Sequence, residues 1–104
     1  MATRAKICTG YTNHMNEWVF EEFFYQHFDG YPENILPILK DITIALDEVF
    51  EKLDDFSDIG GVDFIYYIDE SDQANIRCSV LEFDWKWYNR FVVDHYKIVK
   101  ELVL

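Results

Sequence analysis

The sequence predicts an α+β fold in which a small antiparallel sheet of two hairpins packs against a central amphipathic helix and a C-terminal helix. Three observations lead to this fold class. Polar turns separate two pairs of strand-like segments, an apolar residue recurs every three or four positions from residue 34 to residue 56, and residues 88–103 repeat that spacing. The chain has 104 residues, enough for one core, so residues 1–104 are expected to form a single domain.

The first predicted hairpin joins residues 5–11 to residues 17–28. The segment AKICTGY suits a strand, NHMN is a polar turn, and EWVFEEFFYQHF is rich in aromatic residues that favour strands. Strict alternation would divide its large side chains between two faces, with Trp18, Phe20, Phe24 and Phe28 on one and Val19, Phe23, Tyr25 and His27 on the other. Both faces are largely apolar, which indicates a central or covered strand.

The central helix is predicted from residue 34 to residues 56–58. Its apolar stripe alternates steps of four and three and consists of Ile35, Leu39, Ile42, Leu46, Val49, Leu53 and Phe56. Pro37 would lie in the first turn, where a missing N–H removes no helical hydrogen bond, and Glu33 suits the positive end of the helix dipole. The stripe fits a core-facing surface and a dimer seam equally well, so a homodimer remains open.

The second hairpin is predicted to join VDFIYYID (62–69) to IRCSVLEF (76–83). The apolar residues that follow suit one face of a C-terminal helix, although residues 85–93 also have the composition of a strand. Three aromatic residues there, Trp85, Trp87 and Tyr88, alternate with basic ones and could stack on bases. The net charge of residues 73–104 is only +1, which favours a packing role.

The composition indicates a soluble protein of the cytoplasm. No apolar run approaches the roughly 18–20 residues that span a bilayer, and the N-terminal MATRAKICTGY lacks the apolar stretch of a signal peptide. Cys8 and Cys78 do not have the spacing of a metal site, and two thiols in such a chain suggest a reducing compartment. Neither a metal nor a cofactor is expected.

Negative charge is concentrated in one region of the chain. Twenty acidic residues against nine basic ones give a net charge of −11, which argues against direct binding of DNA or RNA. Residues 41–72 hold eleven of the acids and one base, Lys52. Seven of these acids fall on the predicted helix: Asp41, Asp47, Glu48, Glu51, Asp54, Asp55 and Asp58.

The acids on the predicted helix oppose its formation. Pairs such as Asp47 with Glu51 repel one another across one turn, and the aspartates near the C-terminal end face the negative pole of the helix dipole. A sequence tuned only for folding would place these charges differently. Along one side of the predicted helix the acids form a row of Asp41, Glu48, Glu51, Asp55 and Asp58. Because a helix rises about 1.5 Å per residue, this row would extend about 25 Å and could occupy a basic channel that normally holds nucleic acid.

The stretch HFDGYPE (27–33) has three interpretations. In the first, it is a turn: Asp-Gly reverses the chain and Pro-Glu begins the helix. In the second, His27 is a general base and Asp29 orients it or binds a metal, although no nucleophile lies at a recognisable spacing. In the third, His27, Asp29 and Tyr31 form a corner that holds a small polar ligand.

The same stretch resembles part of a known group of proteins. MATRAKI at the start and YQHFDGYPENI after the hairpin are similar to small uncharacterised bacteriophage proteins, which begin with a MATRS-like stretch and carry a Tyr-x-His-Trp-Asp-Gly-Tyr-Pro-Glu box. The matching residues are Met1 to Arg4, Tyr25, His27, Asp29, Gly30, Tyr31, Pro32 and Glu33, whereas Ala5 and Phe28 depart from the pattern. The resemblance covers roughly the first 45 residues. It implies a phage or prophage origin and no particular reaction.

Together these observations predict a small, phage-type, non-enzymatic binding protein. The expected partner is a host protein or ribonucleoprotein with a basic surface, such as a CRISPR or restriction complex, which the acidic residues would engage as a nucleic-acid mimic. The alternative is a protein that binds or sequesters a nucleotide-like ligand at the corner of His27, Asp29 and Tyr31. A hydrolase at that corner is a third interpretation.

Overall fold

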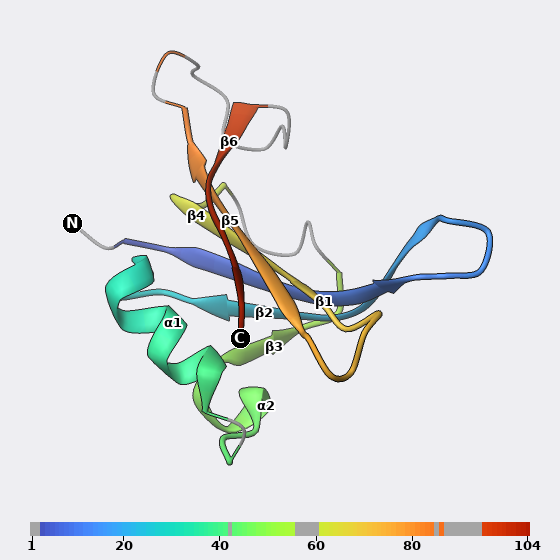
Figure 1. Ribbon diagram of the computed structural model, residues 1–104. Coiled ribbons are helices and arrows are strands. Elements are labelled where there is room, and N and C mark those ends of the chain that lie inside the picture. The colour runs from blue at the N-terminus through green and yellow to red at the C-terminus, as the bar shows by residue number, and fades with distance from the viewer. Residues whose placement is uncertain (1–2, 42, 56–60, 85, 87–94) are drawn as a thin grey trace.

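The computed structural model describes residues 3–41, 43–55, 61–84, 86 and 95–104. Within these residues the chain forms one mixed six-stranded sheet and two short helices (Figure 1). The elements are β1 (Ala5–Thr12), β2 (Trp18–Gln26), α1 (Pro32–Lys40), α2 (Leu46–Val49), β3 (Glu51–Leu53), β4 (Phe64–Asp69), β5 (Arg77–Phe83) and β6 (Tyr96–Val103). The strand order is β3-β2-β1-β4-β5-β6.

Both predicted hairpins are confirmed. β1 pairs antiparallel with β2, and β4 pairs antiparallel with β5. In the first turn, the side-chain oxygen of Asn13 accepts hydrogen bonds from the N–H groups of Met15 and Glu17, at 2.9 and 3.0 Å. β1 and β4 lie side by side and parallel, so the two hairpins join into a single sheet.

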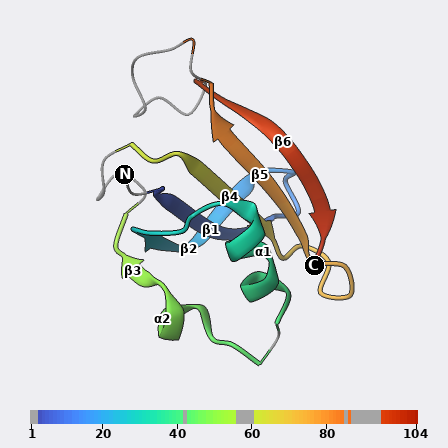
Figure 2. The same ribbon diagram turned by 90° about the vertical axis from the view of Figure 1, so that its left-hand side faces the viewer.

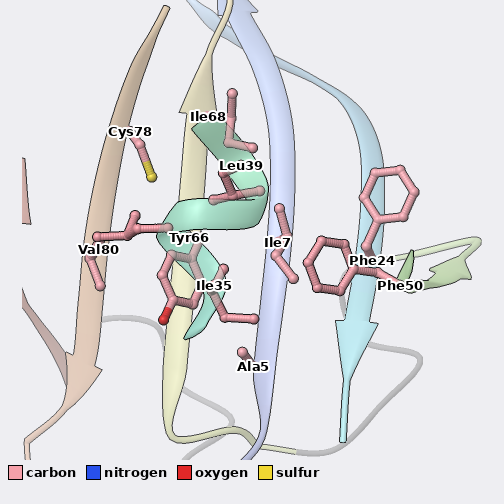
Figure 3. Packing of buried hydrophobic residues seen from close by; sticks show 11 residues of the cluster. Ala5, Ile7, Phe24, Ile35, Leu39, Phe50, Tyr66, Ile68, Cys78 and Val80 are labelled. Atoms are coloured by element: carbon pink, nitrogen blue, oxygen red, sulfur yellow. The ribbon is translucent and has the colours of Figure 1, made fainter. Parts of the chain in front are cut away.

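The helix α1 covers one face of the sheet, which we call the helix face (Figure 2). Ile35, Leu36 and Leu39 are the buried residues of α1. They belong to a cluster with side chains of the central strands, shown in Figure 3: Ala5, Ile7, Phe24, Tyr66, Ile68, Cys78 and Val80. The opposite face has its own cluster, formed by Cys8, Tyr25, Leu53, Val62, Ile65, Leu81, Phe83 and Tyr96. The sheet is therefore apolar on both sides.

The prediction of a two-hairpin sheet packed against a long central helix is wrong. The predicted helix is divided into α1, with nine residues, and α2, with four, and it is followed by the edge strand β3. Since α1 begins at Pro32, Pro37 lies inside the helix rather than in its first turn. Its missing N–H removes the hydrogen bond that residue 37 would otherwise donate to the carbonyl of Glu33.

Two features of the segment after α1 explain the break. The Asp41 carboxylate accepts hydrogen bonds from the backbone N–H and the hydroxyl of Thr43, at 3.0 and 2.6 Å, which fixes a local turn. A continuous helix would also place Asp47 and Glu51, and Glu51 and Asp55, one turn apart, at a cost of about 0.2–0.5 kcal/mol for each pair. The strand at residue 51 removes that spacing.

The apolar stripe of the predicted helix is distributed over different surfaces. Ile35 and Leu39 are buried on the helix face as expected, but Val49 is 42% exposed. Leu53 is buried on the opposite face, and Phe50, which the stripe did not include, is buried on the helix face. Because side chains alternate along an extended chain, Phe50 and Leu53 reach opposite faces of the sheet from its edge at β3.

The predicted C-terminal helix is also wrong. Residues 96–103 form the strand β6, which pairs antiparallel with β5 at one edge of the sheet. Its register with β5 shifts between Val80 and Leu81, where β6 contains an additional residue. Because most of β6 is exposed, its apolar residues follow no strict alternation, which allowed them to imitate a helical spacing. Most of residues 85–93, where strand and helix both remained open, lie outside the described residues.

The predicted faces of β2 need one correction. The register of β1 and β2 shifts between Thr9 and Gly10, so β2 contains one additional residue there. Trp18 and Phe20 consequently share a face with Phe23, whose ring lies 5.3 Å from that of Phe20. Phe24, which alternation grouped with them, is buried on the helix face.

Candidate functional site

The stretch HFDGYPE forms a tightly bonded corner between β2 and α1. The backbone N–H of Gly30 donates to the carbonyl of Thr3 at 2.9 Å, and the hydroxyl of Tyr66 donates to the carbonyl of Gly30 at 2.6 Å. The side-chain amide of Asn34 donates to the carbonyl of Asp29 at 2.7 Å. Asp29 itself has a φ of 55°, as a turn residue in the left-handed region does. These bonds attach the corner to the start of β1 and to β4.

The corner pairs His27 and Asp29 with different partners. Nδ1 of His27 lies 2.7 Å from the hydroxyl of Tyr25, whereas Oδ1 of Asp29 accepts a hydrogen bond from Tyr31 at 3.0 Å. This bond to Asp29 raises the pKa of Tyr31. Both of these hydrogen bonds join residues within 25–31, which agrees with the interpretation of the stretch as a turn. The interpretation as a ligand corner stays a prediction.

The acidic residues of the predicted helix are exposed, but they do not form a helical row. Asp41 follows α1, Asp47 and Glu48 lie on α2, Glu51 begins β3, and Asp54 and Asp55 follow β3. We call these six residues the acidic edge, because β3 is the outermost strand on that side of the sheet. The hydrogen bonds from Thr43 lower the pKa of Asp41, which keeps its carboxylate charged. Asp58 lies outside the described residues.

The single base of residues 41–72 is already engaged by an acid. Nζ of Lys52 lies 3.1 Å from Oε2 of Glu22 on the neighbouring strand β2. Both side chains are exposed, so this ion pair contributes little to stability. It does leave the acidic edge with an excess of negative charge.

A second candidate site, which sequence reasoning missed, lies on the face opposite α1. It is a groove of about 400 Å³ lined by residues of β2, β4, β5 and β6: Trp18, Phe20, Tyr67, Asp69, Ser79, Leu81 and Ile98. The ring of Trp18 lies nearly perpendicular to those of Phe20 and Tyr67, with centroid distances of 5.9 and 6.5 Å. Edge-to-face contacts of this kind hold the three rings in fixed orientations.

Gly10 is the residue that allows the groove to form. A Cβ atom at this position would lie 2.5 Å from the carbonyl oxygen of Val19 and 2.7 Å from the indole of Trp18. The indole therefore lies across the β1 backbone because residue 10 has no side chain. An isolated glycine within a strand is a known sign of a bulge or a close approach, so Gly10 was the signal that could have located this site.

The groove contains one carboxylate and two hydroxyl groups. Oδ1 of Asp69 accepts hydrogen bonds from the backbone N–H and the hydroxyl of Ser71, at 2.9 and 2.5 Å. In the described part of the chain, no donor reaches the other oxygen of Asp69. Burial is the main cause that raises the pKa of Tyr67 to about 12, and electrostatic repulsion from the nearby Cys8 and Tyr96 adds to it. The phenol of Tyr67 therefore stays protonated at neutral pH.

The two cysteines lie on opposite faces of the sheet. Cys8 belongs to the cluster opposite α1, and Cys78 belongs to the helix face. Burial raises the pKa of each thiol to about 12. Among the described residues, no group of three or more His, Cys, Asp or Glu side chains is arranged to hold a metal ion. None of the helices in that part of the chain is long and apolar enough to cross a membrane.

Comparison with protein-family models, with curated proteins and with solved structures finds no match for this chain. Its function is therefore inferred from its own surfaces, of which the acidic edge and the aromatic groove are the most distinctive.

Proposed function

We propose that the protein is a phage-type, non-enzymatic inhibitor that binds a host nucleic-acid-handling defence complex. In this proposal the acidic edge contacts a Lys- and Arg-rich surface that otherwise holds nucleic acid, as in a CRISPR or restriction complex. The observation that carries the proposal is the exposure of all six carboxylates on one short connection of the chain. The phage character rests on the resemblance at residues 1–4 and 25–33.

The charge of the acidic edge supports association with a basic partner. Six carboxylates between residues 41 and 55 share one base, Lys52, which is paired with Glu22 on β2. A concentrated field of one sign accelerates the encounter with a surface of the opposite sign and repels nucleic acid. The strand β3 and the helix α2, which carry three of the six residues, lie at one margin of the sheet (Figure 2).

The geometry differs from that of a straight mimic of a nucleic-acid strand. The regular row of about 25 Å that a continuous helix would supply is replaced by a turn, a short helix and a short strand. The proposal therefore depends on the density of charge at the edge and not on a match to the spacing of phosphates.

The test compares two variants with the same net charge. Asp47→Asn with Glu48→Gln and Glu51→Gln removes three charges from the acidic edge, and Glu17→Gln with Glu33→Gln and Glu101→Gln removes three exposed charges elsewhere. Each variant and the parent chain are immobilised and exposed to a bacterial host lysate, and the retained complexes are identified by mass spectrometry. Labelled target DNA is then added to the retained complexes.

Three results together would support the proposal. A nucleic-acid-handling complex is retained by the parent and by the second variant, is lost with the acidic-edge variant, and is released by competing DNA. Equal retention by all three forms, or retention that DNA does not affect, would contradict binding through the acidic edge.

A further inference from the structure

The groove opposite α1 combines two features that recognise organic cations. It is walled by three aromatic rings, and Trp18, Phe20 and Ile98 leave 36%, 43% and 59% of their surface exposed. It also contains the carboxylate of Asp69. Aromatic faces attract cations through the ring quadrupole, and a carboxylate beside them adds charge-assisted hydrogen bonds.

The rings of the groove are preorganised. Phe20 and Tyr67 are 6.1 Å apart and inclined by 37°, and both are nearly perpendicular to Trp18. The absence of a side chain at Gly10 fixes the position of the indole over β1. A ligand therefore meets aromatic surfaces that need little reordering, which lowers the entropic cost of binding.

The negative charge of the protein disfavours anionic ligands in the groove. The net charge of −11 opposes an anionic nucleotide or nucleic acid on an aromatic platform. Burial raises the pKa of Glu70, which follows Asp69 at the end of β4, and the nearby Glu21 and Glu22 raise it further. The carboxyl groups of Glu21, Glu22 and Glu70 therefore lie near one another at the end of β4 that carries Asp69.

Arg77 is the basic residue nearest to Asp69 in the pairing of β4 with β5. It lines a separate hollow together with Ser71, Asp72, Asn75 and Val103, and this hollow shares only Asp69 with the groove. The side chain of Arg77 therefore leaves the aromatic groove unfilled.

From this arrangement we propose that the groove of Trp18, Phe20 and Tyr67 binds an arginine side chain on the surface of a partner protein. The planar guanidinium stacks on aromatic rings better than an ammonium group does, and its N–H groups suit the three polar groups of the groove. These are the carboxylate of Asp69 and the hydroxyls of Ser79 and Tyr67. The inference rests on the proposed function for the identity of the partner. It adds that an arginine of the partner's basic surface is held in this groove.

The test uses a small probe and no partner protein. The ¹⁵N-labelled full chain is titrated with Nα-acetyl-arginine methylamide at constant ionic strength, and the indole N–H signal of Trp18 is followed by NMR. The signal is assigned by its absence in Trp18→Phe. The control ligand is the corresponding citrulline derivative, which has the same shape but no charge.

We expect saturable shifts in the millimolar range for the arginine probe, at Trp18 and at the backbone amides of Phe20 and Tyr67. The citrulline probe should produce none at the same concentrations. Trp18→Leu should weaken binding about fivefold because it removes the aromatic face, whereas Trp18→Phe should change it less. Asp69→Asn should weaken it about threefold, and Asp47→Asn, an equal change of charge at the acidic edge, should leave it within about 1.5-fold.

Three outcomes would overturn the inference. Equal binding of the citrulline probe would make the site a general apolar one, and equal effects of Asp69→Asn and Asp47→Asn would make the attraction diffuse. Shifts of the Trp18 signal with protein concentration alone would assign the groove to a second copy of this chain. None of these outcomes involves a host complex retained through the acidic edge, so the proposed function can fail while the groove still binds arginine, and the reverse also holds.

Discussion

At Gly30 the corner passes so close to the start of β1 that no side chain fits. A Cβ atom there would lie 2.8 Å from the carbonyl oxygen of Thr3 and 2.9 Å from the Cβ of Ala5. Ala5 is the first residue of the central strand β1 and Thr3 lies two residues before it, so neither can move alone. The glycine of the HFDGYPE stretch is thus required by packing, which explains part of that motif without any reaction.

Gly30→Ala should therefore destabilise the protein by about 1–3 kcal/mol, the usual cost of inserting a methyl group into a filled site. Urea unfolding followed by circular dichroism measures the change. Asp29→Gly is the matched control, since a φ of 55° suits glycine, and it should change the free energy of unfolding by less than about 1 kcal/mol. If Gly30→Ala were neutral, the approach of the corner to β1 would be looser than described.

Glu70 is a second residue whose environment predicts a measurable effect. Burial raises the pKa of its carboxyl, and the charge of Glu21, a hydrogen bond with Glu21 and the charge of Glu22 raise it further. The folded state therefore holds the proton more tightly than the unfolded state. The protonated carboxyl favours folding at low pH, and this contribution is lost as pH rises from the usual carboxyl range through the folded pKa.

Glu70→Gln should accordingly raise the melting temperature at pH 7 and have little effect near pH 4, which is close to the usual glutamate pKa of about 4.3. Thermal unfolding across this pH range tests the prediction. Glu17→Gln, at an exposed position beside the first turn, is the control and should show much less dependence on pH. A Glu70→Gln effect that is the same at both pH values would point to a cause other than ionisation.

At the scale of elements, the edge strand β6 is built to resist pairing with another sheet. Ile98, Val99 and Val103 are 59%, 44% and 50% exposed, which would invite such pairing. Lys97 and Lys100 flank Ile98 and Val99, and the register shift opposite Val80 and Leu81 interrupts the ladder. Charged residues and bulges are the usual protection of an exposed strand edge.

Replacing both lysines of β6 by threonine should expose this edge to association. Analytical ultracentrifugation of Lys97→Thr with Lys100→Thr should detect larger species that the parent chain does not form at the same concentration. Lys40→Thr with Arg77→Thr removes the same charge from exposed positions away from the sheet edges and should behave like the parent. Association by both double variants would show that net charge, and not the edge, is responsible.

The elements also show which parts of the fold a sequence can predict. The strands of both hairpins were predicted correctly because turn residues and strand-forming residues agree there. The long helix was wrong because a regular apolar spacing does not outweigh Pro37, the turn at Asp41 and the repulsion at Glu51. The groove was missed because the residue added in β2 moves Trp18 and Phe20 to another face, and strict alternation does not foresee this change.

At the scale of the whole molecule, charge is unevenly distributed between the two edges of the sheet. The acidic edge lies beside β3, while β6 at the other edge carries Lys97 and Lys100 against one acid, Glu101. Under the proposed function, a partner with a basic surface would thus be drawn toward the β3 edge first. The aromatic groove lies on the sheet face opposite α1, between the two edges. The same partner would contact it after this first encounter.

The excess of acids also has a cost for the folded state as a whole, because compaction brings twenty negative side chains closer together against nine positive ones. Salt screens this repulsion over about 10 Å at 0.1 M ionic strength. Raising sodium chloride from low to moderate concentration should therefore increase the melting temperature, which differential scanning fluorimetry measures. The increase should be smaller for the variant Asp47→Asn with Glu48→Gln and Glu51→Gln. A melting temperature that falls with salt would mean that attractive pairs such as Lys52 with Glu22, 3.1 Å apart, outweigh the repulsion.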